Sequence, residues 1–154
     1  MQLTRAADYA LRVMIHLAEA PPGARARREE LAEASEVPPQ FMAKVLQAMS
    51  RADLITSHRG IHGGFELARP ANRITVLDVV EAIEGPLCLN TCLAQDARCG
   101  RLWWCGGHDV WKQAQAAMMR VLQRATLARL AEDSRARRAG TAPPIPAPLE
   151  QIWN

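Results

Sequence analysis

The sequence lacks the features of an exported or membrane-spanning protein. Its N-terminus has no basic segment followed by an apolar core and a cleavage site, so nothing there resembles a signal peptide. No apolar run approaches the roughly 20 residues that a membrane helix needs. We therefore expect a cytoplasmic protein with no membrane partner, in a compartment where thiols stay reduced.

The sequence also lacks the motifs that indicate an enzyme. It contains neither a phosphate-cradling glycine loop nor a recognisable nucleophile–base constellation, so we expect no catalytic residues. The formal net charge is only +3, and composition alone is weak evidence for a nucleic-acid partner. At 154 residues, 49% of them hydrophobic, the chain is long enough for one globular domain with an appendage.

All four cysteines lie in one stretch, CLNTCLAQDARCGRLWWCGGHDVW, which starts at Cys88. In a reduced compartment such a cluster favours metal binding over disulfides. Thiolates suit zinc or iron–sulfur clusters, but structural zinc sites usually use paired CxxC knuckles, and none is present. The wider spacing of Cys92, Cys99 and Cys105, followed by His108, favours a multi-iron cluster. A zinc-stabilised regulator without a sensing cluster is the alternative. Cys88 lies apart, as another candidate ligand or an inert buried thiol.

The N-terminal half predicts a helix-turn-helix. Apolar residues in 3–19 recur with the 3.6-residue period of a helix, which Pro21-Pro22-Gly23 ends. A short helix over 27–34 and a helix over 38–51 follow, the second opened by prolines. Phe41, Val45, Leu46 and Met49 form the predicted buried side of this second helix. The expected DNA-facing residues on it are Pro39, Gln40, Lys44 and Gln47.

A glycine-rich hairpin follows the helix pair. Residues 54–57 and 65–67 have strand character, and the segment HRGIHGG between them permits a tight turn. A helix-turn-helix followed by a basic hairpin is typical of a winged helix. Arg59 and His62 are therefore further candidates for DNA contact.

The rest of the chain predicts two more helices and a tail. Residues 75–78 match a capping box, with Asp78 in place of Glu, and Gly85-Pro86 ends that helix. Residues 109–131 then read as one long helix with a heptad seam that favours pairing with a second chain. The expected dimer contacts are Trp111, Ala114, Met118, Val121 and Ala125. From Ser134 the proline-rich chain is expected to be irregular.

In combination, these motifs resemble the family of winged-helix iron–sulfur regulators that includes IscR, NsrR and RirA. The opening LTRAADYALRVMIHLA resembles the first helix of that family, and SHRGIHGGFELAR resembles its wing. Cys92, Cys99, Cys105, His108 and Trp111 resemble its cluster loop, and TLARLA resembles the end of its dimer helix. The resemblance covers residues 1 to about 132.

The resemblance implies a cytoplasmic transcription regulator, such as a repressor, that binds a palindromic promoter site in double-stranded DNA as a homodimer. It implies that Cys92, Cys99 and Cys105 hold an iron–sulfur cluster which responds to redox state, nitric oxide or cluster supply. His108 matches the fourth ligand of IscR-like proteins and favours a [2Fe-2S] cluster. Asp8 of the partner chain matches the NsrR-like arrangement with a [4Fe-4S] cluster. IscR-like proteins carry an acidic residue where this chain has Ala43, so an IscR-type target preference is not implied.

The expected fold is mainly α with a small β-hairpin wing. We predict a winged helix-turn-helix domain over 1–86, a cluster-binding loop over 87–108, a dimerisation helix within 109–132 and an irregular tail over 133–154.

Overall fold

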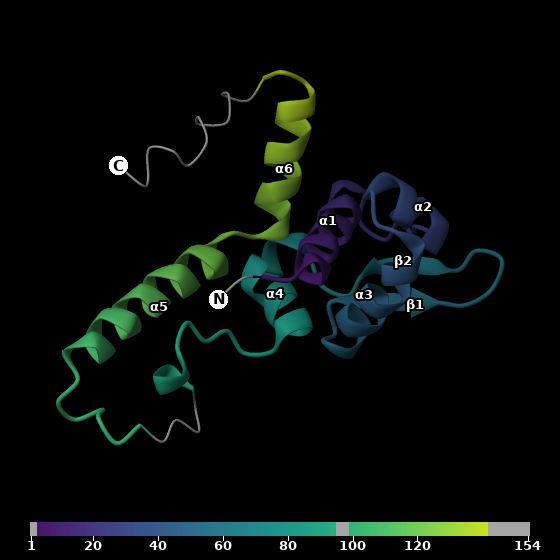
Figure 1. The fold of residues 1–154 in the computed structure, drawn as a ribbon. Coiled ribbons are helices and arrows are strands. Elements are labelled where there is room, and N and C mark those ends of the chain that lie inside the picture. The colour runs from purple at the N-terminus through teal and green to yellow at the C-terminus, as the bar shows by residue number, and fades with distance from the viewer. Residues whose placement is uncertain (1–2, 95–98, 142–154) are drawn as a thin grey trace.

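The computed structural model describes residues 3–94 and 99–141, which form a mainly helical chain with one small hairpin (Figure 1). The elements are, in order, α1 (Arg5–Glu19), α2 (Arg28–Ala34), α3 (Pro39–Arg51), β1 (Ile55–His58), β2 (Gly64–Leu67), η1 (Ala71–Arg73), α4 (Val76–Glu84), η2 (Thr91–Leu93), α5 (Gly106–Arg124) and α6 (Leu127–Arg138). The predicted fold class, a winged helix-turn-helix with a C-terminal helical extension, is confirmed. No helix of the described residues is both long and apolar enough to cross a membrane.

Helix α1 is the centre of the core. Its apolar positions lie on one side, and Ala10, Val13 and Met14 have no exposed surface. This side packs against α3, α4 and α6, while α2 contributes Leu31 to the same cluster. On α3 the buried side chains are Met42, Val45, Leu46 and Met49, and Phe41 is only half-buried against the aromatic ring of Tyr9. Helices α1, α2 and α3 therefore bury their apolar residues in one core, as their amphipathic spacing predicts.

The wing is an antiparallel hairpin in which Ile55 pairs with Leu67 and His58 with Gly64. Ala26, just before α2, forms two backbone hydrogen bonds with Phe65, which attach the hairpin to the helix-turn-helix. The turn requires glycine at position 63, because a Cβ there would lie 2.4 Å from the carbonyl oxygen of His58. The predicted hairpin is confirmed, and it is joined to the helices at its base.

Helix α4 begins with the predicted capping box. The backbone N–H of Asp78 donates to the Thr75 hydroxyl, and the Asp78 carboxylate accepts from the backbone N–H of Thr75 at 2.8 Å. One face of α4 joins the main core through Val79. Another face, with Val76, Leu77 and Val80, forms a second apolar cluster against α5. Thus α4 links the winged-helix core to the C-terminal part of the chain.

The predicted single helix over 109–131 is wrong, because the structure contains two helices that meet at Ala125 and Thr126. There the backbone pairs with the segment before α4: the N–H of Val76 donates to the carbonyl of Ala125, and the N–H of Leu127 donates to that of Ile74. The hydroxyl of Thr126 then accepts from Arg129 and caps α6. In a continuous helix these N–H and carbonyl groups of Ala125 and Leu127 would form intrahelical hydrogen bonds instead.

The tail also begins later than expected, since α6 continues through Ser134 to Arg138. Leu127 and Ala131 are completely buried in the main core, and Arg138 forms an ion pair with Glu19 of α1. Helix α6 is therefore part of the winged-helix body. Of the described helices, α5 is the one that projects from this body (Figure 1). The remainder of the predicted tail, residues 142–154, lies outside the described residues.

Candidate metal centre and nucleic-acid interface

The outward side of α3 carries the polar residues that were predicted to face DNA. Pro39, Gln40, Lys44 and Gln47 are all exposed, and Ala43 lies on the same side. The turn between α2 and α3 is tight, because Glu36 adopts a left-handed conformation with φ of 53°. The exposed surface of α3 therefore combines the positive charge of Lys44, and that of Arg51 at the end of the helix, with two amide side chains. Positive charges are suited to phosphates, and amides are suited to base edges.

The wing adds a second basic region. Arg59 and His62 are exposed at the turn, as predicted. Two arginines that the sequence analysis did not single out hold the backbone of this turn. The guanidinium of Arg27 donates to the carbonyl of Ile61 at 3.1 Å, and that of Arg25 lies 3.5 Å from the carbonyl of His62. These contacts join positions 34 and 37 residues apart, so no local pattern in the sequence indicated them.

The cysteine loop connects α4 with α5 and is attached at both ends. At its start Leu87 is buried in the second apolar cluster, and the backbone N–H of Leu89 donates to the side chain of Gln115 on α5 at 3.0 Å. At its end Cys105 is the residue before α5 and His108 lies in the first helical turn. Residues 95–98 of the loop lie outside the described residues.

All four thiols are free and half-buried. The Cys88 thiol already donates to the carbonyl of Asn90 at 2.8 Å, so it has a partner within the protein. By contrast, the Nδ1 atom of His108 is buried without a hydrogen-bond partner. A buried polar atom without a partner is costly unless something else satisfies it. Cys105 and His108 are one helical turn apart, and the N–H of His108 donates to the Cys105 carbonyl.

Within residues 3–94 and 99–141, no three Cys, His, Asp or Glu side chains are gathered as a metal site. The structure thus places the predicted ligands on one loop and one helix start without closing them around a common point. Asp8, the alternative ligand, lies on α1, where its carboxylate pairs with Arg12 at 2.8 Å. Three thiols and an imidazole nonetheless form a donor set that fits an iron–sulfur cluster, and the unpartnered His108 nitrogen agrees with that fit.

Helix α5 has no buried residues and exposes large apolar side chains. The predicted dimer seam is divided between two faces of this helix. Met118 and Ala125 pack on the cluster beneath α4, whereas Trp111 is 44% exposed and Val121 is 67% exposed. Four of the exposed apolar positions of α5 follow the 4-3-4 spacing of one helix side. They are Val110, Ala114, Ala117 and Val121. We call this set the free stripe of α5.

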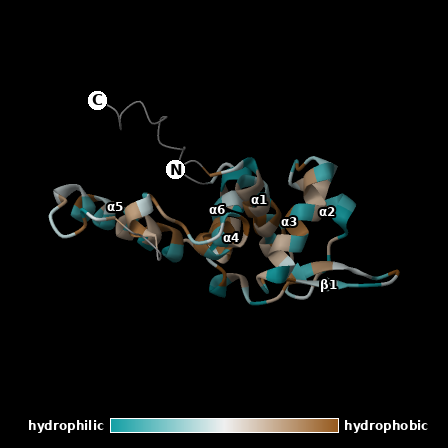
Figure 2. Ribbon diagram, turned by 60° about the horizontal axis from the view of Figure 1, so that its bottom comes forward, coloured by the Kyte–Doolittle hydropathy of each residue, from teal (hydrophilic) through white to brown (hydrophobic). Residues whose placement is uncertain are grey.

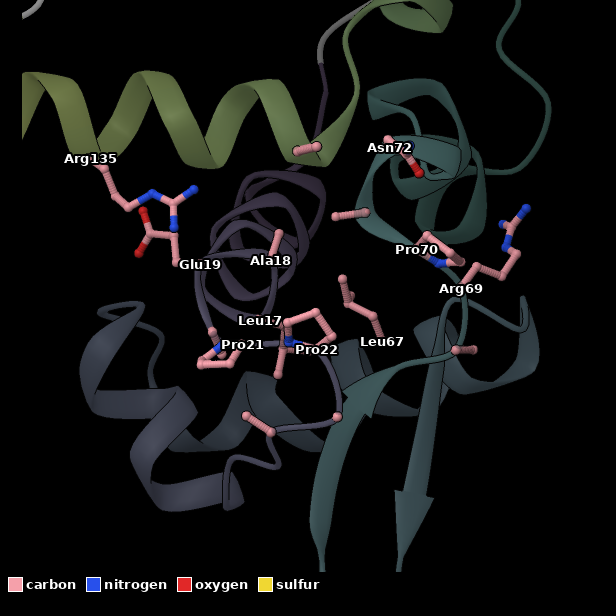
Figure 3. Close-up of a pocket in the computed structure, with 16 residues that line it drawn as sticks. Leu17, Ala18, Glu19, Pro21, Pro22, Leu67, Arg69, Pro70, Asn72 and Arg135 are labelled. Atoms are coloured by element: carbon pink, nitrogen blue, oxygen red, sulfur yellow. The ribbon is translucent and has the colours of Figure 1, made fainter.

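An apolar hollow is lined by residues outside the cysteine loop. It has a volume of about 780 Å³ and is bordered by the end of α1, the connector after β2 and α6 (Figure 3). Its wall is mainly apolar, with Leu17, Pro22 and Leu67 among the lining residues, and Arg135 and Glu19 point toward one another at its edge. It contains no cysteine or histidine, so it is not the predicted metal centre.

Comparison with protein families gives one match over most of the chain. Residues 3–133 match the Rrf2 family, described as iron-dependent transcriptional regulators. The protein Rv1287 of Mycobacterium tuberculosis, which bears the name of an HTH-type transcriptional regulator, is 38% identical over 135 residues. That match covers 85% of this chain and 81% of the Mycobacterium protein.

Solved structures show the same fold. CymR of B. subtilis, described as a global cysteine regulator, has a TM-score of 0.70 at 23% identity and covers 86% of this chain and 97% of its own. CymR of Staphylococcus aureus has a TM-score of 0.65 at 26% identity, with 84% and 97% covered. IscR of T. potens has a TM-score of 0.70 at 21% identity, with 100% and 97% covered.

Proposed function

The chain belongs to the Rrf2 family of transcriptional regulators, and from this premise we propose that it senses redox, nitric oxide or iron–sulfur status through a bound cluster. Transcriptional regulators of this family are not enzymes, and they bind DNA. The finer proposal is that Cys92, Cys99, Cys105 and His108 hold the cluster, with [2Fe-2S] favoured over [4Fe-4S]. The observation that supports it most is the buried Nδ1 atom of His108. This atom has no hydrogen-bond partner among the described residues, and it lies at the end of a loop of free thiols.

The proposed DNA interface consists of α3 and the wing. Pro39, Gln40, Lys44 and Gln47 are exposed on α3, and Arg59 and His62 are exposed on the wing. We expect α3 to enter the major groove and the wing to follow the phosphates or the minor groove. A homodimer paired along the free stripe of α5 would present two copies of α3 to the two halves of a palindromic promoter site, about one helical turn of DNA apart.

The same residues suggest how the cysteine loop influences DNA binding. When bound, the cluster would supply iron sites at which redox change or nitric oxide can exchange a ligand. Leu87 and Leu89 attach the loop to α4 and α5, and α4 packs on both α1 and α3. A change in loop conformation is therefore transmitted to the element that positions α3. The spacing of the two recognition helices, and with it DNA affinity, depends on this path.

His108 is a better candidate than Asp8 for the fourth ligand. The Asp8 carboxylate pairs with Arg12, and this pair would have to open before the carboxylate contacted iron. The imidazole of His108 is next to Cys105 and its Nδ1 atom is unpartnered.

The experiment that tests this function is anaerobic reconstitution with iron and sulfide, followed by visible absorbance and metal analysis. We expect a coloured protein, and His108→Ala should change its spectrum while Asp8→Ala leaves it unchanged. Cys88→Ala is the matched control, because its thiol has a protein partner. A colourless wild-type protein that contains zinc would establish the zinc-stabilised alternative. A wild-type spectrum in His108→Ala, together with a lost one in Asp8→Ala, would establish the NsrR-like ligand set.

A further inference from the structure

The tip of the wing carries an apolar side chain that has no packing partner within the described residues. Ile61 is 84% exposed. Apart from Leu3, the other exposed large apolar side chains of the described residues lie on the cysteine loop and α5. The end of the hairpin, away from the helices, is coloured as hydrophobic (Figure 2). Single exposed apolar residues are common, so exposure alone assigns no role to Ile61.

The backbone beneath Ile61 is held from several sides. The N–H of Gly63 donates to the carbonyl of Gly60 at 2.9 Å, which makes Ile61 and His62 the two central residues of a tight turn. The guanidinium of Arg27, which precedes α2, donates to the Ile61 carbonyl at 3.1 Å. The turn is thus fixed to the helix-turn-helix, while the Ile61 side chain extends away from it into solvent.

The residue type is not explained by the turn itself. Neither Ile61 nor His62 has a positive φ, so the turn requires no particular residue type at these two positions. A β-branched side chain does not stabilise the turn by bonding to its backbone, and its χ1 angle is restricted. Ile61 therefore presents a stiff apolar group on a fixed backbone, two residues after the basic side chain of Arg59. This combination matches the apolar wedges that proteins insert between base steps from the minor groove.

We propose that Ile61 is a specificity-determining residue: an apolar wedge that enters the minor groove and selects duplexes with an easily unstacked pyrimidine–purine step. Arg27 acts as a positioning residue, because it holds the backbone from which the wedge projects. This inference rests on the proposed function, in which the wing contacts DNA. TA and CA/TG steps unstack at lower cost than other steps, so a wedge converts DNA deformability into sequence preference without a hydrogen bond to a base.

The test is a parallel selection of binding sites from a randomised duplex library by the full-length wild type, Ile61→Ser and Arg27→Ala. Leu3→Ser, which removes another exposed leucine-sized apolar group far from the wing, is the matched control. Wild type and control are expected to enrich a pyrimidine–purine step at a fixed distance from the bases read by α3. Ile61→Ser and Arg27→Ala should lose this step and keep the α3-read bases. Ile61→Ser should bind the wild-type duplex about tenfold more weakly, the scale of one lost apolar contact, with an unchanged salt slope.

The outcomes separate this inference from the proposal beneath it. If Ile61→Ser enriches the same steps and binds within about twofold of wild type, the wedge is refuted although DNA recognition stands. If Ile61→Ser loses the enriched pyrimidine–purine step but Arg27→Ala still enriches it, the positioning role of Arg27 is refuted. If the wild type enriches no sequence at all, the DNA-binding proposal fails, and the wedge fails with it.

Discussion

At the scale of single residues, the start of α1 is tied to the end of α4 by one carboxylate. The Thr4 hydroxyl donates to Glu84 at 2.6 Å, and the Thr4 backbone N–H donates to the same oxygen at 2.9 Å. Chiefly the hydroxyl bond, and then the backbone bond, lowers the pKa of Glu84 below its ordinary value. A lowered folded-state pKa contributes stability above the ordinary carboxyl range, and this is lost as the pH falls through the folded-state value.

We therefore expect Thr4→Val to unfold more easily than wild type at neutral pH, with the difference shrinking in acid as Glu84 becomes protonated. Urea titrations across the acid range, with the free energy of unfolding compared at each pH, measure this. Glu81→Gln is a control for loss of a nearby charge on α4. A difference between Thr4→Val and wild type that stays constant down to the most acidic pH would contradict the assigned bonds.

At the scale of elements, the free stripe of α5 predicts which substitutions should prevent dimerisation. Val121 is 67% exposed, so a charge there is tolerated in a single chain but would be buried without a partner in a dimer. Val121→Glu should sediment as a folded monomer with unchanged helical content. Gln123→Glu adds the same charge to another exposed side of α5 and should remain dimeric. Sedimentation of Val121→Glu as a wild-type-like dimer would place the interface elsewhere.

The two DNA-facing elements predict a salt dependence. Lys44 on α3 and Arg59 on the wing each offer one positive charge to the duplex, so each loss should lower the slope of log affinity against log salt by about one unit. The double variant Lys44→Ala with Arg59→Ala should thus bind more weakly and lose about two units, by fluorescence anisotropy. Lys112→Ala, an exposed lysine on α5, should leave the slope unchanged. An unaltered affinity in the double variant would remove α3 and the wing from the interface.

Periodicity was sufficient to predict α1 to α4, because each of these helices buries apolar residues at helical spacing, with α4 contributing to both apolar clusters. It failed at Ala125, which continues the spacing of α5 although the helix ends there. The cause is a backbone pairing with Ile74 and Val76, which no local pattern records. The spacing also could not separate Met118, which faces α4, from Val121, which faces outward, since both satisfy the heptad rule. The contact between the Arg27 guanidinium and the Ile61 carbonyl joins residues 34 positions apart, so periodicity could not predict it.

At the scale of the whole molecule, the winged-helix body contains α1 to α4, the hairpin and α6. Among the described residues, α5 and the adjoining parts of the cysteine loop extend from it (Figure 1). The loop therefore joins the winged-helix body to α5, the helix proposed for dimerisation. In the proposed dimer, a change in the cluster ligands would alter the relative orientation of the two winged-helix bodies on the promoter site. The spacing of Cys92, Cys99, Cys105 and His108 makes them candidate ligands, and this assignment stays a prediction. Their closure around one cluster does not follow from the spacing, and it also remains a prediction.

The most direct test compares DNA affinity with and without the cluster in the same protein. Anaerobically reconstituted wild type is titrated by fluorescence anisotropy against its selected duplex, and again after the iron is removed with a chelator. A coupling of about 1–3 kcal/mol between the two sites is expected, which is roughly a 5- to 150-fold change in affinity. Cys99→Ser should show one affinity under both treatments. Equal affinities of the wild type with and without its cluster would contradict the account, whatever the spectrum shows.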